Sequence, residues 1–340
     1  MSTSAPGARP AADDERPGAD LLPAGGWLAP GAVELVDAED SLVDGGAAAA
    51  EVFAAQIARA ADAGRACVVV LAPDPDPTRE SVGRRAELAR AAVAAAGTHD
   101  VAAWLTVRDP LRVARTAGAG DVGRTLAALH HALLGHGAAA TALREAGAGV
   151  VGTAVHLEVT RPADPSSAPD LAAALEADLL TNHVVLGPLL DGSYPVEARA
   201  ATAPAGWDHV RPGDLVAIRR GLDVLVVEHS GTRTARRAGR DRADATGAGT
   251  TVRPAGTPGA DDVELVHAGR TPGGREADPS GLYEVLAALD NAYLGTPLLG
   301  LVPTGAGEVG HGPGLAAHEE AARRAATDGA DVRGLLATAS

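Results

Sequence analysis

The chain of 340 residues contains no lysine, so all 29 of its basic residues are arginines. A lysine is needed to form a Schiff base with a carbonyl substrate and to complete a P-loop, so both kinds of site are excluded. Acidic residues number 44, which gives a net charge of −15. Because nucleic acids and anionic membrane surfaces are negatively charged, neither is expected as a partner.

Cysteine and aromatic residues are also scarce. Cys67 is the only cysteine, which excludes an intramolecular disulfide and a cysteine-based metal site. The chain has 3 Trp, 3 Tyr and 1 Phe, few for residues that commonly anchor ligands in pockets. No apolar run reaches the roughly 18 residues of a membrane span, and the N-terminus lacks the apolar segment of a signal peptide. We therefore expect a cytoplasmic globular protein, and we predict no cofactor.

Two segments have no regular pattern. Residues 1–25 mix Ser, Pro, Gly, Ala and Asp, which predicts a disordered N-terminal arm. Residues 231–275, which begin with a run rich in Arg and Gly, are predicted as a variable loop within a domain that covers 26–340.

Elsewhere strand-like and helix-like segments alternate. Strands are predicted at 32–37, 66–72, 101–107, 150–159, 222–227, 297–302 and 332–337. Helices are predicted at 47–63, 80–96, 125–146, 168–186, 212–220, 278–288 and 315–328. This alternation fits a (β/α)8 barrel or a doubly wound sheet. No glycine-rich phosphate-binding loop follows the first strand, which favours the barrel.

Residues 104–110 read W-L-T-V-R-D-P. They resemble the W-x-T-x-N-E-P motif that closes the fourth barrel strand of glycoside hydrolase family 1, the β-glucosidase family. Further segments resemble the same family at 151–162, 186–195, 207–215 and 278–286. The resemblance runs from about residue 52 to the C-terminus. It implies an α/β fold, a (β/α)8 TIM barrel shortened at the N-terminus and after the eighth strand, and descent from enzymes that act on O-glycosyl bonds in carbohydrate metabolism.

The two glutamates of that family are missing at the matching positions. A retaining glycosidase needs an acid/base carboxyl group and a nucleophilic carboxylate about 5–5.5 Å apart. The resemblance places the acid/base at Asp109 and the nucleophile at Pro303, which has no carboxylate. An Asp in place of a Glu retracts the carboxyl group, and a misplacement of about 1 Å can cost on the order of 10²-fold in rate. We therefore expect a pseudoenzyme that has lost the retaining mechanism.

Other polar residues at predicted strand ends leave alternatives open. A rebuilt active site could use Asp109, Glu228 and His229, because barrel enzymes carry their sites at the carboxyl ends of strands. Candidate residues for binding a glycoside or another small molecule are Arg108, His156, His229 and Asp74. The plainer interpretation is a solvated polar rim in which Arg108 forms an ion pair.

Two further alternatives concern a metal and a partner protein. His156, Glu158 and His229 could approach one another, but their spacing does not require a zinc site, and no metal is predicted. The chain could also be a non-catalytic binding or scaffold module, as a homodimer or paired with an active relative.

Overall fold

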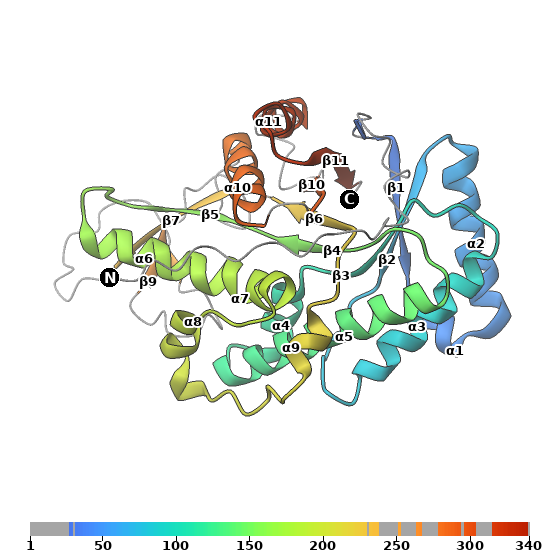
Figure 1. Ribbon diagram of the computed structural model, residues 1–340, viewed down its shortest axis with the longest axis horizontal. Coiled ribbons are helices and arrows are strands. Elements are labelled where there is room, and N and C mark those ends of the chain that lie inside the picture. Colours follow the sequence, from blue (N-terminus) through green and yellow to red (C-terminus); the bar gives the residue numbers. More distant parts are fainter. Residues whose placement is uncertain are drawn as a thin grey trace, which may run out of the picture.

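The computed structural model describes residues 27–237 except 30 and 230, together with 251–252, 263–266, 278–293, 296–303 and 315–338. The predicted arm at 1–25 lies outside these residues. Seven parallel strands form one sheet in the order β1, β2, β3, β4, β6, β10, β11 (Figure 1). Their bounds are β1 (Val33–Ala38), β2 (Ala66–Leu71), β3 (Ala103–Arg108), β4 (Val151–His156), β6 (Val224–Glu228), β10 (Leu298–Pro303) and β11 (Val332–Thr338).

All seven strands predicted from the sequence are present, with ends shifted by a few residues. They are runs of Val, Leu and Ala, which suit strands that are buried on both faces. Side chains on one face form a core made by the strands themselves, with Val70 on β2, Leu105 on β3 and Leu301 on β10 among its members. Side chains on the other face pack against helices in two separate clusters. A sheet that encloses its own core in this way is curled into a barrel.

The barrel is shortened where its first strand is expected. Leu28 forms a parallel bridge with Gly334 of β11. The Leu28 amide donates to the Arg333 carbonyl at 3.0 Å, and the Leu335 amide donates to the Leu28 carbonyl at 3.0 Å. A Cβ on Gly334 would lie 2.5 Å from that of Leu28, so this approach requires glycine. Residues 27–29 thus extend the sheet beyond β11 by a single described bridge.

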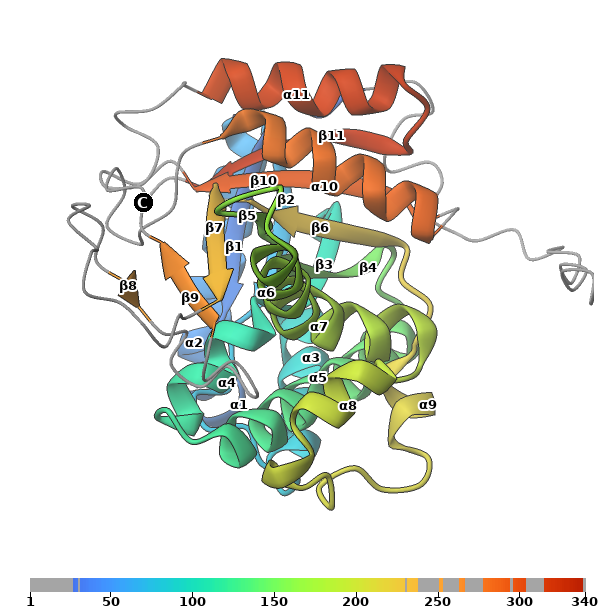
Figure 2. The ribbon, with the colours of Figure 1, turned by 90° about the vertical axis from the view of Figure 1, so that its left-hand side faces the viewer.

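Helices connect the strands and cover the outer face of the sheet. The longer ones are α2 (Gly46–Asp62), α3 (Val82–Ala96), α5 (Val122–Glu145), α6 (Ala168–Asp178), α10 (Pro279–Ala292) and α11 (Leu315–Thr327). The shorter ones are α1 (Ser41–Asp44), α4 (Pro110–Gly118), α7 (Val184–Leu186), α8 (Val196–Ala201) and α9 (Asp214–Ile218), with π-helices η1 (Leu179–His183) and η2 (Gly187–Asp191) and the 3₁₀-helix η3 (Ala203–Ala205). Figures 1 and 2 show α10 and α11 together on the side opposite α3 and α5. None of the helices in the described ranges is long and apolar enough to cross a bilayer.

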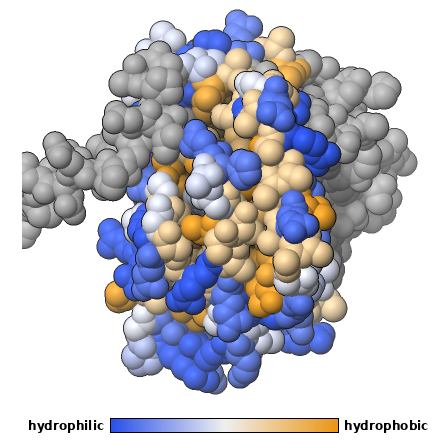
Figure 3. Space-filling view, turned by 90° about the vertical axis from the view of Figure 1, so that its right-hand side faces the viewer, coloured by the Kyte–Doolittle hydropathy of each residue, from blue (hydrophilic) through white to orange (hydrophobic). Residues whose placement is uncertain are grey.

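Figure 3 views the side on which Figure 1 shows α2. Apolar residues gather towards the middle of this face and hydrophilic ones surround them (Figure 3). Val52 on α2 is 62% exposed, whereas Phe53 and Ile57 of the same helix are buried against the sheet. One face of α2 therefore anchors the helix, and the other faces solvent.

A second, smaller sheet lies beside the barrel (Figure 2). Its strands are β5 (Val159–Pro162), β7 (Thr232–Arg237), β9 (Val263–Val266) and β8 (Thr251–Val252), in that order. β7, β8 and β9 fall inside the segment 231–275 that the sequence predicts as a variable loop, and β9 pairs antiparallel with both β7 and β8. Ala235 of β7 and Val263 of β9 pack against α6, so the sheet has an apolar anchor of its own.

Candidate functional site

The predicted site residues come from the carboxyl ends of the barrel strands. Arg108 is the last residue of β3, His156 of β4, Glu228 of β6 and Pro303 of β10, and Asp109 follows Arg108 directly. Because the strands are parallel, these ends meet at one rim. In (β/α)8 enzymes that rim carries the active site.

Arg108 and Glu228 form an ion pair across the barrel mouth. The register between β3 and β4 shifts between Leu105 and Arg108. The Arg108 Nε donates to Glu228 Oε2 at 2.8 Å, passing over β4, which pairs with both strands. Burial opposes the ionisation of Glu228, but the Arg108 guanidinium outweighs it and holds the pKa of Glu228 below its usual value. The carboxylate is therefore ionised and occupied by its partner.

Asp109 starts a helix. Its backbone is left-handed, with φ 47° and ψ 65°, and its carboxylate accepts from the Arg112 amide at 3.0 Å as the N-cap of α4. Oδ2 also accepts from Arg112 Nε at 3.2 Å. Pro110 follows at the first helical position, where its missing N–H costs nothing. The Asp109 carboxylate is thus engaged in both local bonds and is only 9% exposed.

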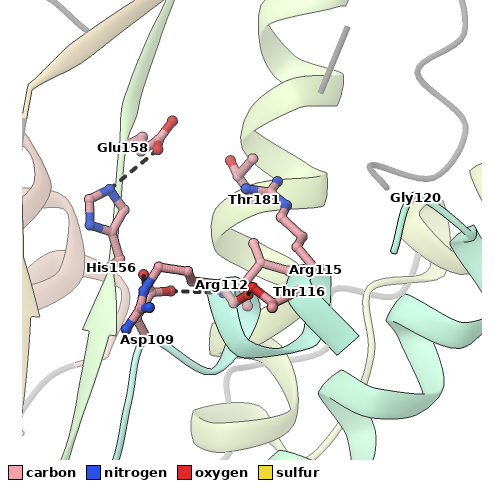
Figure 4. Close-up of a pocket in the computed structure, with 9 residues that line it drawn as sticks. Asp109, Arg112, Arg115, Thr116, Gly120, His156, Glu158 and Thr181 are labelled. Atoms are coloured by element: carbon pink, nitrogen blue, oxygen red, sulfur yellow. Dashed lines mark hydrogen bonds and ion pairs between the residues drawn. The ribbon is translucent and has the colours of Figure 1, made fainter. Parts of the chain in front are cut away.

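A cavity of about 280 Å³ opens at this rim (Figure 4). It is lined by Asp109, Leu111, Arg112, Arg115, Thr116, Gly120, His156, Glu158 and Thr181. Figure 4 shows the residues of α4, the end of β4 and η1 facing the same space. Pockets for drug-sized ligands begin near 300 Å³, so this cavity suits a small ligand. Of the predicted site residues it contains Asp109 and His156; Arg108, Glu228, His229 and Asp74 are not in its lining.

Glu158 is the most tightly held group in the cavity wall. It is 4% exposed, and its Oε1 lies 3.2 Å from His156 Nε2 and accepts from Arg233 Nη2 at 3.0 Å. Its backbone exchanges two hydrogen bonds with the Asn182 amide, at 3.1 Å and 2.7 Å. Asn182 and the cavity residue Thr181 both lie in η1, and π-helical turns are frequent at functional sites. Glu158 is therefore held in the wall through both its side chain and its backbone.

Two predicted residues lie elsewhere. His229 is fully buried on the outer side of the sheet, where its Nδ1 lies 3.1 Å from the Leu157 carbonyl and its ring contacts Gly281 of α10. Burial lowers the pKa of His229 to about 4. Asp74 lies in the turn after β2, where its Oδ1 accepts from the Asp76 amide. In the described part of the chain, no group of three His, Cys, Asp or Glu side chains is placed to hold a metal.

The sequence did not point to Arg112, Arg115 or Thr181 as site residues. Asp109, Arg112 and Arg115 are spaced three apart, which places them on one face of a helix, but no helix was predicted immediately after Pro110. That spacing was the available signal. For Thr181 the π-helical turn has no comparable sequence pattern.

The comparisons with known proteins agree with one another. The model of glycosyl hydrolase family 1 matches residues 96–312. A bifunctional β-D-glucosidase/β-D-fucosidase from Bifidobacterium breve is 34% identical over 230 residues, which are 62% of this chain and 47% of that protein. The chain therefore spans about half the length of the curated relative that it matches.

Solved structures share the fold. The psychrophilic β-glucosidase from Micrococcus antarcticus superposes with a TM-score of 0.77 at 24% identity, covering 89% of this chain and 73% of that one. A family 1 β-glucosidase from Thermotoga maritima gives a TM-score of 0.72 at 17% identity, covering 90% and 72%. At these identities the likeness concerns the backbone, and it confirms the shortened (β/α)8 barrel.

Proposed function

The chain belongs to glycosyl hydrolase family 1, and from that premise we propose that it is a member that does not hydrolyse β-glycosides by the retaining mechanism and that binds a small polar ligand in the cavity beside Asp109. The proposal has two parts, the loss of the chemistry and the retention of a ligand site. Each part rests on its own observations and has its own measurement.

The observation that carries the first part is that the carboxylate nearest to the end of β10, Glu228, is already bound by an arginine. In the register of β10 with β6, Leu301 pairs with Glu228, so Pro303 ends its strand beside the end of β6. Glu228 is thus the neighbouring carboxylate that could replace the missing nucleophile, and Arg108 already binds it. Removing the nucleophile of a catalytic unit typically abolishes nearly all of the unit's contribution to the rate.

The second part rests on the cavity lining. The lining contains two carboxylates, Asp109 and Glu158, and two arginines, Arg112 and Arg115. Asp109 is bound to Arg112, and Glu158 is bound to His156 and to Arg233 behind the wall. Such a wall offers hydrogen bonds without a strong net charge, which suits a neutral polyol or sugar better than a phosphate. The curated relative acts on β-glucosides and β-fucosides by its name, so glucose and fucose are the first ligands to test.

Hydrolysis of aryl β-glucosides and aryl β-fucosides tests the loss of activity. The variants are Asp109→Asn, which can keep the N-cap and tolerates the left-handed backbone, and Glu228→Gln. The Bifidobacterium breve relative serves as the positive control. We expect the unaltered protein to be no faster than either variant. Turnover that disappears in both variants would instead support the rebuilt active site and overturn the proposal.

Calorimetric titration with glucose and with fucose tests the ligand site. Thr181→Trp would fill the cavity from η1 and should abolish the binding heat, whereas the exposed Thr116→Ser should keep it. Equal binding to both variants would place the ligand elsewhere. Light scattering in the same samples distinguishes a monomer from the homodimer of the scaffold alternative.

A further inference from the structure

Arg85 on α3 carries a buried positive charge outside the cavity described above. The residue is 6% exposed, and within the described residues neither Nη1 nor Nη2 has a hydrogen-bond partner. Its aliphatic stem packs against Gly135 of α5, where an added Cβ would lie 2.9 Å from Arg85 Cγ. The glycine on one helix thus makes the room that the arginine on the other helix occupies.

Among the described residues, carboxylates compensate this charge only from a distance. Burial is the largest influence on Arg85 and lowers its pKa, while Asp40 and Asp74 act against it from a distance and Arg84 adds to it. Neither carboxylate forms an ion pair with Arg85 in the described part of the chain. Asp40 lies 3.5 Å from Arg84, and Asp74 caps its own turn. A buried ion without a partner carries a large desolvation cost, so an additional group is required nearby.

The space beside Arg85 is small. A cavity of about 10 Å³ is lined by Arg85 together with Asp74, Pro77, Ser81, Thr106, Val107, Val113, His131 and Ala132. The Thr106 hydroxyl already bonds to His136 and to the Gly152 carbonyl, and the Ser81 hydroxyl bonds to Thr78. A volume of this size holds one small particle, such as a water molecule or a chloride ion, and is too small for sulfate, phosphate, carboxylic acids and sugars.

We propose that this cavity is a binding site for a monatomic anion of the halide class, held by the guanidinium of Arg85 between α3 and α5. A halide supplies the charge and accepts the hydrogen bonds that both Nη groups can donate, whereas a water molecule supplies no charge. Asp74 faces the same cavity and opposes an anion there. The affinity for the anion therefore depends on two side chains of opposite charge: Arg85 attracts the ion, and Asp74 weakens its binding.

A bromide soak shows where the ion binds, and a chloride titration of the melting temperature measures how strongly it binds. In crystals soaked in sodium bromide we expect an anomalous peak within hydrogen-bond distance of Arg85. The melting temperature should rise with sodium chloride beyond its rise in sodium gluconate of equal ionic strength, because a ligand of the native state raises stability as its concentration exceeds its Kd.

Matched variants separate the site from a general salt effect. Arg85→Met should remove the chloride-specific rise, and Arg90→Met, on the same helix but 55% exposed, should retain it. If Arg85→Met does not fold, Asp74→Asn supplies a second readout, with half-saturation at a chloride concentration lower by on the order of tenfold. An equal chloride response in all variants, or no bromide peak at Arg85, would show that the cavity holds water only and would overturn the proposal.

Discussion

Arg108 and Glu228 form an ion pair that joins the ends of β3 and β6 at the barrel mouth. Their side chains are 30% and 13% exposed, so the pair is partly desolvated and each charge relies on the other. The ionised Glu228 stabilises the fold at pH values above the ordinary Glu pKa of 4.5, and this contribution is lost as the pH falls through the lowered pKa of the folded state.

Replacing Arg108 by Met should leave Glu228 buried without its cation. We expect the free energy of unfolding at neutral pH to fall by about 2 kcal/mol, somewhat less than for a fully buried pair. Urea denaturation measures the change. The double variant Arg108→Met, Glu228→Gln is the control, and it should recover most of the loss because no charge is stranded. An Arg108→Met protein as stable as the original would show that the pair contributes nothing.

At the scale of helices, close approach between α5 and α9 depends on one glycine. A Cβ on Gly137 would lie 2.0 Å from the Ala217 carbonyl oxygen, and this backbone atom cannot move aside alone. Gly83 on α3 has nothing within 4 Å of the same hypothetical atom. A glycine-to-alanine substitution therefore meets a crowded backbone at Gly137 and open space at Gly83.

Gly137→Ala should separate α5 from α9 and destabilise the protein by about 1–3 kcal/mol, as overpacking does. Gly83→Ala should stabilise it by up to about 1 kcal/mol, because alanine is the better helix former. Thermal unfolding of the two variants, side by side, measures both shifts. A Gly137→Ala variant that melts at or above the original temperature would contradict the close contact.

The elements that the sequence predicted are those with strong local patterns. The buried strands are runs such as 66–71, and the helix at 168–186 was found although it passes through η1 and α7. β7 was missed because its Thr and Arg residues lack the usual apolar alternation, and its stability comes from β5, β9 and α6. Pairing partners of this kind lie far apart in the sequence, and no local pattern encodes them.

At the scale of the whole molecule, the sequence predicts which residues of the candidate site lie at the ends of barrel strands. Arg108, Asp109, His156 and Glu228 share the rim because parallel strands end together. His229 does not, since adjacent residues of a strand point to opposite faces and Glu228 takes the inner one. Which carboxylate pairs with which arginine depends on three-dimensional distances, which spacing along the chain does not supply.

Buried histidines should make the whole molecule acid-sensitive. Burial lowers the pKa of His136 and of His229 to about 4, against 6.5 for an ordinary histidine. Both are neutral in the native state, so below pH 6.5 the unfolded chain binds more protons and the free energy of unfolding falls. Each of these two histidines contributes about 1.4 kcal/mol per pH unit in the range where only the unfolded chain is protonated. His209, whose pKa burial also lowers to about 4, and His130 and His131, whose pKa values burial lowers as well, add to the slope. His183, whose pKa is raised by Asp178, adds stability as the pH falls towards 6.5 and contributes little slope well below that value, where both states bind its proton.

Urea denaturation between about pH 6.5 and 4.5 measures this slope, at a salt concentration high enough to screen the net charge of −15. His136→Phe removes one titrating ring, so the slope should fall by the contribution of one proton, about 1.4 kcal/mol per pH unit. Thr106 keeps its hydrogen bond to the Gly152 carbonyl in this variant. A flat profile in the unaltered protein would mean that both buried rings accept protons in the native state, which requires water to reach the outer face of the sheet.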